Sequence, residues 1–184
     1  MSKIKQLMQS YRQYIAVPWR NDVAADQRVI FCIYAASDER ALRVHLDEFG
    51  LITKETQHNW AVFDLTDTFA HWLSKQKYAK SYFQQPNKLS DAVLGRYLQE
   101  ITTQFASFIG QNKLNEHSVV AVQGVGSLFG LLKVKDVVDH FAPMVQGRLV
   151  IFFPGNYENN NYRLLDGYDG WNYHAVPVTA GKVF

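Results

Sequence analysis

The residues whose types and spacing could do chemistry lie mainly where strands are expected to end. The turn Gly124-Val125-Gly126-Ser127 has two glycines that allow a close backbone approach, and backbone amides in such a turn can face an anion. Its spacing differs from that of a dinucleotide-binding loop, because Gly130 lies one position beyond the usual third glycine. We therefore interpret it mainly as a tight strand-to-helix turn. Anion binding by Gly124, Gly126 and Ser127 is the alternative.

Two carboxylates are candidates for a metal site. Asp64 and Asp67 flank the expected end of a strand and offer oxygen ligands, but Asp67 equally suits the N-terminus of the next helix. The six histidines show neither H-x-x-x-H nor H-E-x-x-H spacing. Cys32, the single cysteine, lies within an apolar run and is expected to be a small core residue. We predict no metal ion and no other cofactor.

The sequence lacks the local motifs of the common enzyme classes. A G-x-x-x-x-G-K-[ST] loop is missing after the first expected strand, where Asp38 and Glu39 would repel a phosphate. Ser127 does not lie in a G-x-S-x-G elbow, so it does not resemble the nucleophile of a hydrolase. We therefore predict no catalytic residues and a protein that is not an enzyme.

The segment 154–173 concentrates aromatic and asparagine side chains around Arg163. Rigid rings with polar neighbours are typical of recognition surfaces, since they give contact area at low entropic cost. An equally good interpretation is a self-packed loop whose rings cover the end of the sheet. Under the first interpretation the partner-binding residues are Tyr157, Tyr162, Arg163, Asp166, Trp171 and Tyr173.

Apolar runs alternate with amphipathic segments along the chain. Strands are expected at 29–34, 60–65, 118–122 and 149–153, and helices at 4–15, 37–50, 66–73, 90–109 and 134–141. This order predicts an α/β fold with a mostly parallel central sheet and helices on both faces. The tail predicts an antiparallel hairpin, with Tyr162–Leu165 and Trp171–Val178 around the loop Asp166–Gly170.

We expect a single domain over 1–184, made of an N-terminal helix (1–20), a βα body (28–153) and an aromatic, Asn-rich loop and hairpin (154–180). The composition, 47% hydrophobic and 20% charged, is typical of a soluble domain. No apolar run reaches the roughly 18–20 residues that cross a bilayer, and the lone cysteine suits a reducing compartment, so a cytoplasmic protein is expected.

The charge pattern gives little support for nucleic-acid binding. The net charge is only +2, and the basic residues are scattered rather than clustered. Direct DNA contact through the N-terminal helix, by Lys3, Lys5, Arg12 and Arg20, is a third possibility. We expect any contact with DNA to be weak or indirect.

The second half of the chain resembles a known family. The resemblance is carried by Gly124-Val125-Gly126-Ser127-Leu128-Phe129, by Leu132-Lys133-Val134-Lys135-Asp136-Val137-Val138, by Leu149-Val150-Ile151-Phe152-Phe153-Pro154-Gly155-Asn156-Tyr157, and by the segment Tyr162–Pro177. Together these stretches are similar to the BrxB family of bacterial BREX phage-defence systems. The similarity is strongest from about residue 118 to 178.

The resemblance implies a small cytoplasmic component of a defence locus that also encodes a DNA methyltransferase, a large ATPase and the phosphatase-like protein PglZ. The family has no established catalytic residues, so no active site can be transferred. What the resemblance implies is an assembly component whose first expected partner is PglZ, followed by the methyltransferase and the ATPase. The alternative function is a degenerate nucleotide- or metal-binding α/β domain that acts in DNA processing.

Overall fold

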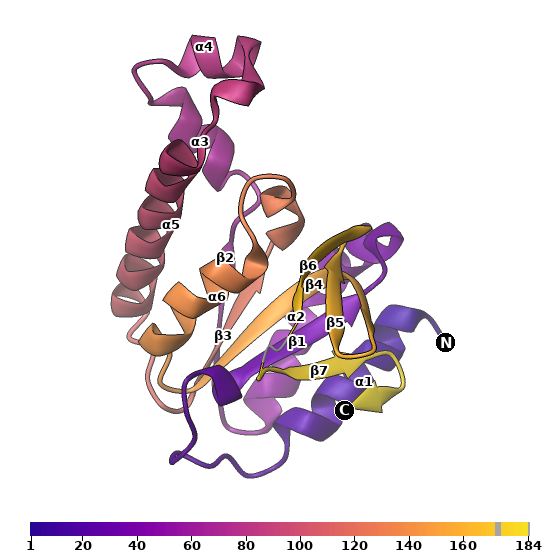
Figure 1. Cartoon of the computed structure of the whole chain (residues 1–184). Coiled ribbons are helices and arrows are strands. Elements are labelled where there is room, and N and C mark those ends of the chain that lie inside the picture. The colour runs from indigo at the N-terminus through magenta and orange to yellow at the C-terminus, as the bar shows by residue number, and fades with distance from the viewer. Residues whose placement is uncertain (172–173, 184) are drawn as a thin grey trace.

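A computed structural model describes residues 1–171 and 174–183 (Figure 1). The helices of this part are α1 (Lys3–Ile15), α2 (Glu39–Glu55), α3 (Thr68–Ser74), α4 (Ala79–Gln84), α5 (Asp91–Gln111) and α6 (Val134–Phe141). The strands are β1 (Val29–Tyr34), β2 (Asn59–Asp64), β3 (Ser118–Gln123), β4 (Arg148–Glu158), β5 (Asn161–Leu164), β6 (Gly167–Trp171), β7 (Val176–Thr179) and β8 (Lys182–Val183).

The strands form one sheet in the order β2-β3-β4-β1-β7-β8, in which β2, β3, β4, β1 and β7 are parallel. The step from β1 to β2 crosses the sheet in one direction, and the steps from β2 to β3 and β4 return in the other. Since parallel crossovers are right-handed, these opposite directions place the connecting helices on opposite faces. Accordingly α2, with α1, covers one face, and α5 and α6 cover the other.

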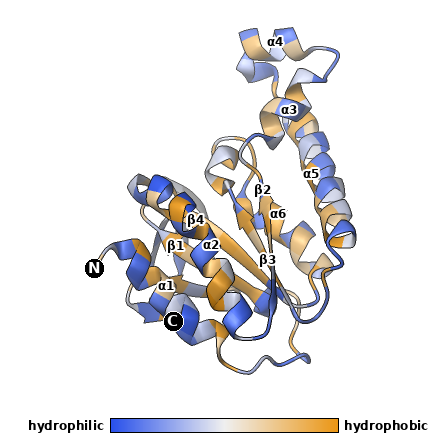
Figure 2. Cartoon of the chain, turned by 180° about the vertical axis from the view of Figure 1, so that it is seen from behind, coloured by the Kyte–Doolittle hydropathy of each residue, from blue (hydrophilic) through white to orange (hydrophobic). Residues whose placement is uncertain are grey.

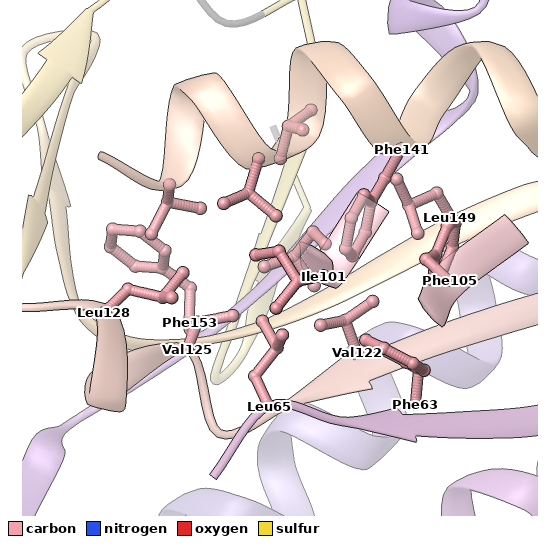
Figure 3. Close-up of a cluster of buried hydrophobic side chains, with 14 of the residues drawn as sticks. Phe63, Leu65, Ile101, Phe105, Val122, Val125, Leu128, Phe141, Leu149 and Phe153 are labelled. Carbon is pink, nitrogen blue, oxygen red and sulfur yellow. The ribbon is translucent and has the colours of Figure 1, made fainter. Parts of the chain in front are cut away.

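Each central strand contributes side chains to two cores. Phe31 and Phe153 point to the α5–α6 face, whereas Cys32 and Phe152 point to the α1–α2 face. Because both faces are covered, these strands contain continuous apolar runs, which is why they are recognisable in the sequence. On the α5–α6 side Phe105 stacks on Phe141 with ring centroids 3.9 Å apart (Figure 3).

The segment between β4 and β7 takes the place of a crossover helix. The last residues of β4 pair with β5 in antiparallel register, and β5 pairs with β6. This hairpin covers the α5–α6 face over β1 and β4, where the Tyr162 ring lies 4.8 Å from Phe31 and 5.8 Å from Phe153. A Cβ atom at Gly155 would lie 1.8 Å from the Arg163 carbonyl oxygen, so only glycine allows this pairing.

The structure confirms the predicted α/β class, with a mostly parallel sheet, an N-terminal helix and antiparallel pairing near the C-terminus. The details of the tail differ. The predicted loop Asp166–Gly170 lies largely in β6, because the chain turns already at Leu165 and Asp166. The later run supplies β7, which joins β1 in parallel rather than pairing with β5. No helix in the described ranges is long and apolar enough to cross a bilayer.

Two helices also differ from the sequence prediction. Gly50 does not end α2, which continues to Glu55. A Cβ atom at Gly50 would lie 2.7 Å from Cδ1 of Trp60, so this glycine makes room for an indole ring rather than stopping the helix. The segment 75–88, between the helices predicted at 66–73 and 90–109, contains the additional short helix α4.

Candidate functional site

The carboxyl ends of the parallel strands meet at one edge of the sheet, where ligands bind in many α/β proteins. The chain leaves β1 toward one face and β4 toward the other, so a crevice opens between these two strands. A pocket of about 260 Å³ lies at this edge. It is lined by Ala36, Glu39, Arg43, Thr66, Gly124, Gly126, Ser127, Pro154 and Leu165.

The charged groups of this edge are connected by hydrogen bonds through Thr66. Asp64 accepts bonds from the Thr66 amide (2.9 Å), the Thr66 hydroxyl (2.5 Å) and the Gln123 side chain (2.9 Å). Arg43 donates to the Thr66 hydroxyl (2.9 Å) and to Glu39 (2.8 Å). Both carboxylate oxygens of Asp64 therefore already have protein donors.

Glu39 also accepts a hydrogen bond from the hydroxyl of Tyr34. Burial and the neighbouring Glu39 carboxylate raise the pKa of the Tyr34 phenol, so it remains a donor at neutral pH. Within residues 1–171 and 174–183 no three His, Cys, Asp or Glu side chains are grouped so that they could hold a metal ion. Asp67 precedes α3 without a side-chain hydrogen bond to the helix.

The turn after β3 has the geometry expected of a tight strand-to-helix connection. Gly124 adopts a positive φ of 77°, and a Cβ atom there would lie 2.5 Å from the Thr66 hydroxyl oxygen. The Ser127 hydroxyl lies 2.7 Å from the Gly124 carbonyl and 3.1 Å from the Leu65 carbonyl, so it ties the turn to the end of β2. Gly126 lies beside Pro154. Anion binding by this turn stays a prediction.

The six residues proposed for partner binding fall into different environments. Tyr162 is 1% exposed, and its ring lies among Phe31, Phe153 and Tyr157. Burial raises the pKa of the Tyr162 phenol. Its ring is therefore an anchor of the hairpin and cannot form part of an exposed surface in this fold. Tyr157 is half-buried, and its hydroxyl donates to Asn160 (2.8 Å).

The other candidates lie around the β5–β6 turn or beyond it. Arg163 and Asp166 are exposed, and the Arg163 guanidinium donates to the Asp166 carbonyl oxygen at 3.2 Å. Trp171 is the last residue of β6. Tyr173 lies outside the described residues. The structure thus places Arg163 and Asp166 together and separates both from the buried Tyr162 ring.

A feature that the sequence analysis missed lies beside this turn. Phe129, 47% exposed, packs so closely on the hairpin that a Cβ atom at Gly167 would lie 2.6 Å from its ring. A pocket of about 360 Å³ is lined by Phe129, Gly130, Leu131, Leu132, Lys133, Leu164 and Gly167, and we call it the hairpin pocket. The sequence did contain a signal for this pocket. Three of its large apolar side chains, Phe129, Leu131 and Leu132, flank Gly130 between the predicted strand at 118–122 and the predicted helix at 134–141.

The basic residues of the N-terminal region do not form a free cationic surface. Arg12 pairs with Glu55 on α2, and Arg20 pairs with Asp22 at 2.8 Å. Lys3 and Lys5 are exposed. Two of the four basic residues predicted for direct DNA contact are therefore already paired with carboxylates.

Comparison with known proteins identifies the family of the chain. Residues 61–178 match the model of the family described as BREX protein BrxB. No curated protein and no solved structure matches the chain. The matched range begins in β2 and ends in β7, so it contains the Gly124 turn, the hairpin pocket and the hairpin. Since the match covers more than half of the sequence, the chain belongs to the BrxB family and is a component of a BREX phage-defence system.

Proposed function

We propose that this chain is a non-catalytic assembly component that binds other BREX proteins. PglZ is the first partner to test, followed by the methyltransferase and the large ATPase. The single observation that carries the proposal is the hairpin pocket, where the exposed ring of Phe129 packs on the β5–β6 hairpin.

The composition of this surface supports a protein partner. Its centre is apolar, with Phe129, Leu132 and Leu164. Three charged residues, Lys133, Arg163 and Asp166, line the pocket or directly adjoin its lining residues in the sequence. Protein interfaces commonly combine an apolar centre with a polar rim, and an aromatic ring at the centre often contributes most of the affinity. The whole surface lies within the part of the chain that matches the BrxB family.

The test is co-purification of the full chain with tagged PglZ from the same defence locus, followed by sizing and titration calorimetry. We expect a stoichiometric complex. Phe129→Asp should weaken it at least about tenfold, because a carboxylate would be desolvated at the centre of the interface. Arg163→Glu should have a smaller effect at the rim.

The matched control is Val44→Asp on α2, which changes a 74% exposed apolar residue in the same way but lies outside the family match. It should bind like the unchanged chain. Equal affinity for Phe129→Asp and Val44→Asp would remove the hairpin pocket as the binding surface. Failure to bind PglZ, the methyltransferase and the ATPase in turn would reject the assembly function, and heat on titration with nucleotide and Mg²⁺ would then favour nucleotide binding.

A further inference from the structure

A second surface lies at the opposite end of the family match. Residues 68–90 form α3, α4 and a 3₁₀ turn at Pro86–Lys88, and we call this segment the lobe. The lobe stands beyond the strands, next to the N-terminal end of α5, and both views of the molecule show it projecting from the body (Figures 1 and 2). It is held at its base by Trp72, whose ring lies 5.5 Å from Tyr97 of α5.

The lobe is one of two strongly basic segments of the chain, and in the other, residues 1–20, Arg12 and Arg20 are paired with carboxylates. The lobe contains Lys75, Lys77, Lys80 and Lys88 and no aspartate or glutamate. The whole chain has a net charge of only +2, so the remainder is net negative. All four lysines are exposed, and none pairs with a carboxylate in the part of the chain that the structure describes. The positive charge of this projecting segment is therefore available to a partner.

Aromatic side chains lie among these lysines. Tyr78 is 58% exposed and Phe83 is 61% exposed, which is unusual for rings of this size. The Lys77 ammonium lies 5.4 Å from the centroid of the Tyr78 ring. A pocket of about 330 Å³ is lined by Gln76, Lys77, Tyr78, Tyr82 and Arg96. Two cations, Lys77 and Arg96, thus lie beside the ring of Tyr78, and Phe83 and the other lysines are exposed on the same short segment.

We propose that the lobe binds a single strand of nucleic acid, with the lysines and Arg96 on its phosphates and with Tyr78 and Phe83 stacked on its bases. Basic grooves with exposed rings bind single strands in this way, because unpaired bases offer their faces. A duplex would leave these rings without a role, since its bases are already stacked. The cores of protein interfaces are depleted in lysine, so a protein partner fits this composition less well.

The proposal concerns a surface different from the hairpin pocket and does not depend on it. Binding is measured by the fluorescence anisotropy of a labelled oligothymidylate of about 20 nucleotides, a length that exceeds the site of one small domain. The full chain is titrated between about 50 and about 200 mM salt. We expect affinity to fall with salt, with a slope of about −0.7 in log–log form for each phosphate contacted.

Two sets of variants separate charge from stacking. Replacing Lys77, Lys80 and Lys88 with Gln should reduce the slope by about 2, since about three phosphate contacts are lost. The double change Tyr78→Ala and Phe83→Ala should lower affinity by at least about fivefold and leave the slope unchanged, because stacking releases no counterions. All five positions are exposed, so an unchanged unfolding midpoint is expected and confirms that each variant is folded.

Matched controls remove equal charge, or two exposed apolar side chains, elsewhere in the chain. The control set for the lysines is Lys3→Gln, Lys5→Gln and Lys54→Gln, and that for the rings is Val44→Ala with Leu51→Ala, all exposed. Both control chains, and Phe129→Asp, should bind the oligonucleotide like the unchanged chain. A matching oligouridylate shows whether the strand is DNA or RNA, and binding of either supports the proposal.

Three results would overturn it. The first is no binding of either single strand at low salt. The second is an equal loss of affinity in the lobe variants and their controls, which would mean non-specific attraction. The third is tighter binding of a duplex of the same length or of polyglutamate, which would assign the lobe to double-stranded DNA or to an acidic protein. Loss of PglZ binding by Phe129→Asp, with oligonucleotide binding retained, would show that the two surfaces act separately.

Discussion

The hairpin and the lobe are both rich in aromatic residues, yet they place their rings in opposite environments. In the hairpin, Tyr162 is 1% exposed and lies against Phe31 and Phe153. In the lobe, Tyr78 and Phe83 are each more than half exposed. Composition indicates that rings are present, but the nearest apolar face decides whether they are buried.

The cause of the difference is where each segment leaves the sheet. The hairpin follows β4, which lies in the middle of the sheet, and it folds back over an apolar face that α5 and α6 leave open. The lobe follows β2 at the edge of the sheet, and α4 has no buried residue. The hairpin is thus part of the core, whereas the lobe is held mainly through Trp72 of α3, which packs on Tyr97 of α5.

The largest expected effect tests this contrast with one substitution in each segment. Tyr162→Ala removes a fully buried ring and should lower the free energy of unfolding by about 3–5 kcal/mol. Tyr78→Ala removes a mostly exposed ring and should change it by less than about 0.5 kcal/mol. Urea unfolding measures both values. Similar losses in the two variants would contradict the assignment of the hairpin to the core.

A smaller effect is expected where β4 and β5 approach each other. Gly155→Ala would place Cβ 1.8 Å from the Arg163 carbonyl oxygen, and backbone cannot rotate away as a side chain can. We expect a loss of about 3 kcal/mol, at the upper end for overpacking. Gly126→Ala is the control, because its Cβ would lie 3.4 Å from Pro154, which is ordinary contact, and it should cost less than about 1 kcal/mol. Equal costs would mean that the hairpin shifts easily on the sheet.

Much of the βα body could be predicted from the sequence because local signals agree there with the tertiary structure. The run Val29–Tyr34 is apolar throughout and is buried on both faces. Ser90 was expected to begin a long helix, and its hydroxyl accepts the Val93 amide at the start of α5. Such elements can be predicted from the local sequence, because the burial pattern and the capping residue both lie within a few residues.

The tail and the site depend on contacts that the local sequence does not contain. The partner of β7 is β1, which lies more than a hundred residues earlier, so its parallel pairing could not be inferred from turn residues. Tyr162 has the same local composition as a surface tyrosine and is buried only because β5 lies across Phe31. The hairpin pocket needs the loop at Phe129 and the strand at Gly167 to meet. Exposure of Arg163 and Asp166, in contrast, follows from their charge.

The smallest expected effect asks whether the lobe and the body unfold together. Gly95 lies in α5 near the lobe, and a Cβ atom there would meet nothing within 4 Å. Gly95→Ala should therefore raise the free energy of unfolding by about 0.5–1 kcal/mol through helix propensity alone. The control is Gly110→Ala, in the last turn of the same helix, where a Cβ atom also meets nothing within 4 Å. Because helix propensity counts less in the last turn, its free energy of unfolding should rise by no more than that of Gly95→Ala.

The two glycine variants test whether the lobe is as firmly part of the fold as the hairpin. Helix α5 joins the lobe to the sheet, where Ile101 and Phe105 are fully buried. A gain from Gly95→Ala in global urea unfolding means that the lobe end of α5 belongs to the same cooperative unit as the sheet. If only Gly110→Ala raises the global value, while Gly95→Ala raises hydrogen-exchange protection in the lobe alone, the lobe opens on its own. In that case the surface with Tyr78 and Phe83 would be ordered by its partner rather than by the fold.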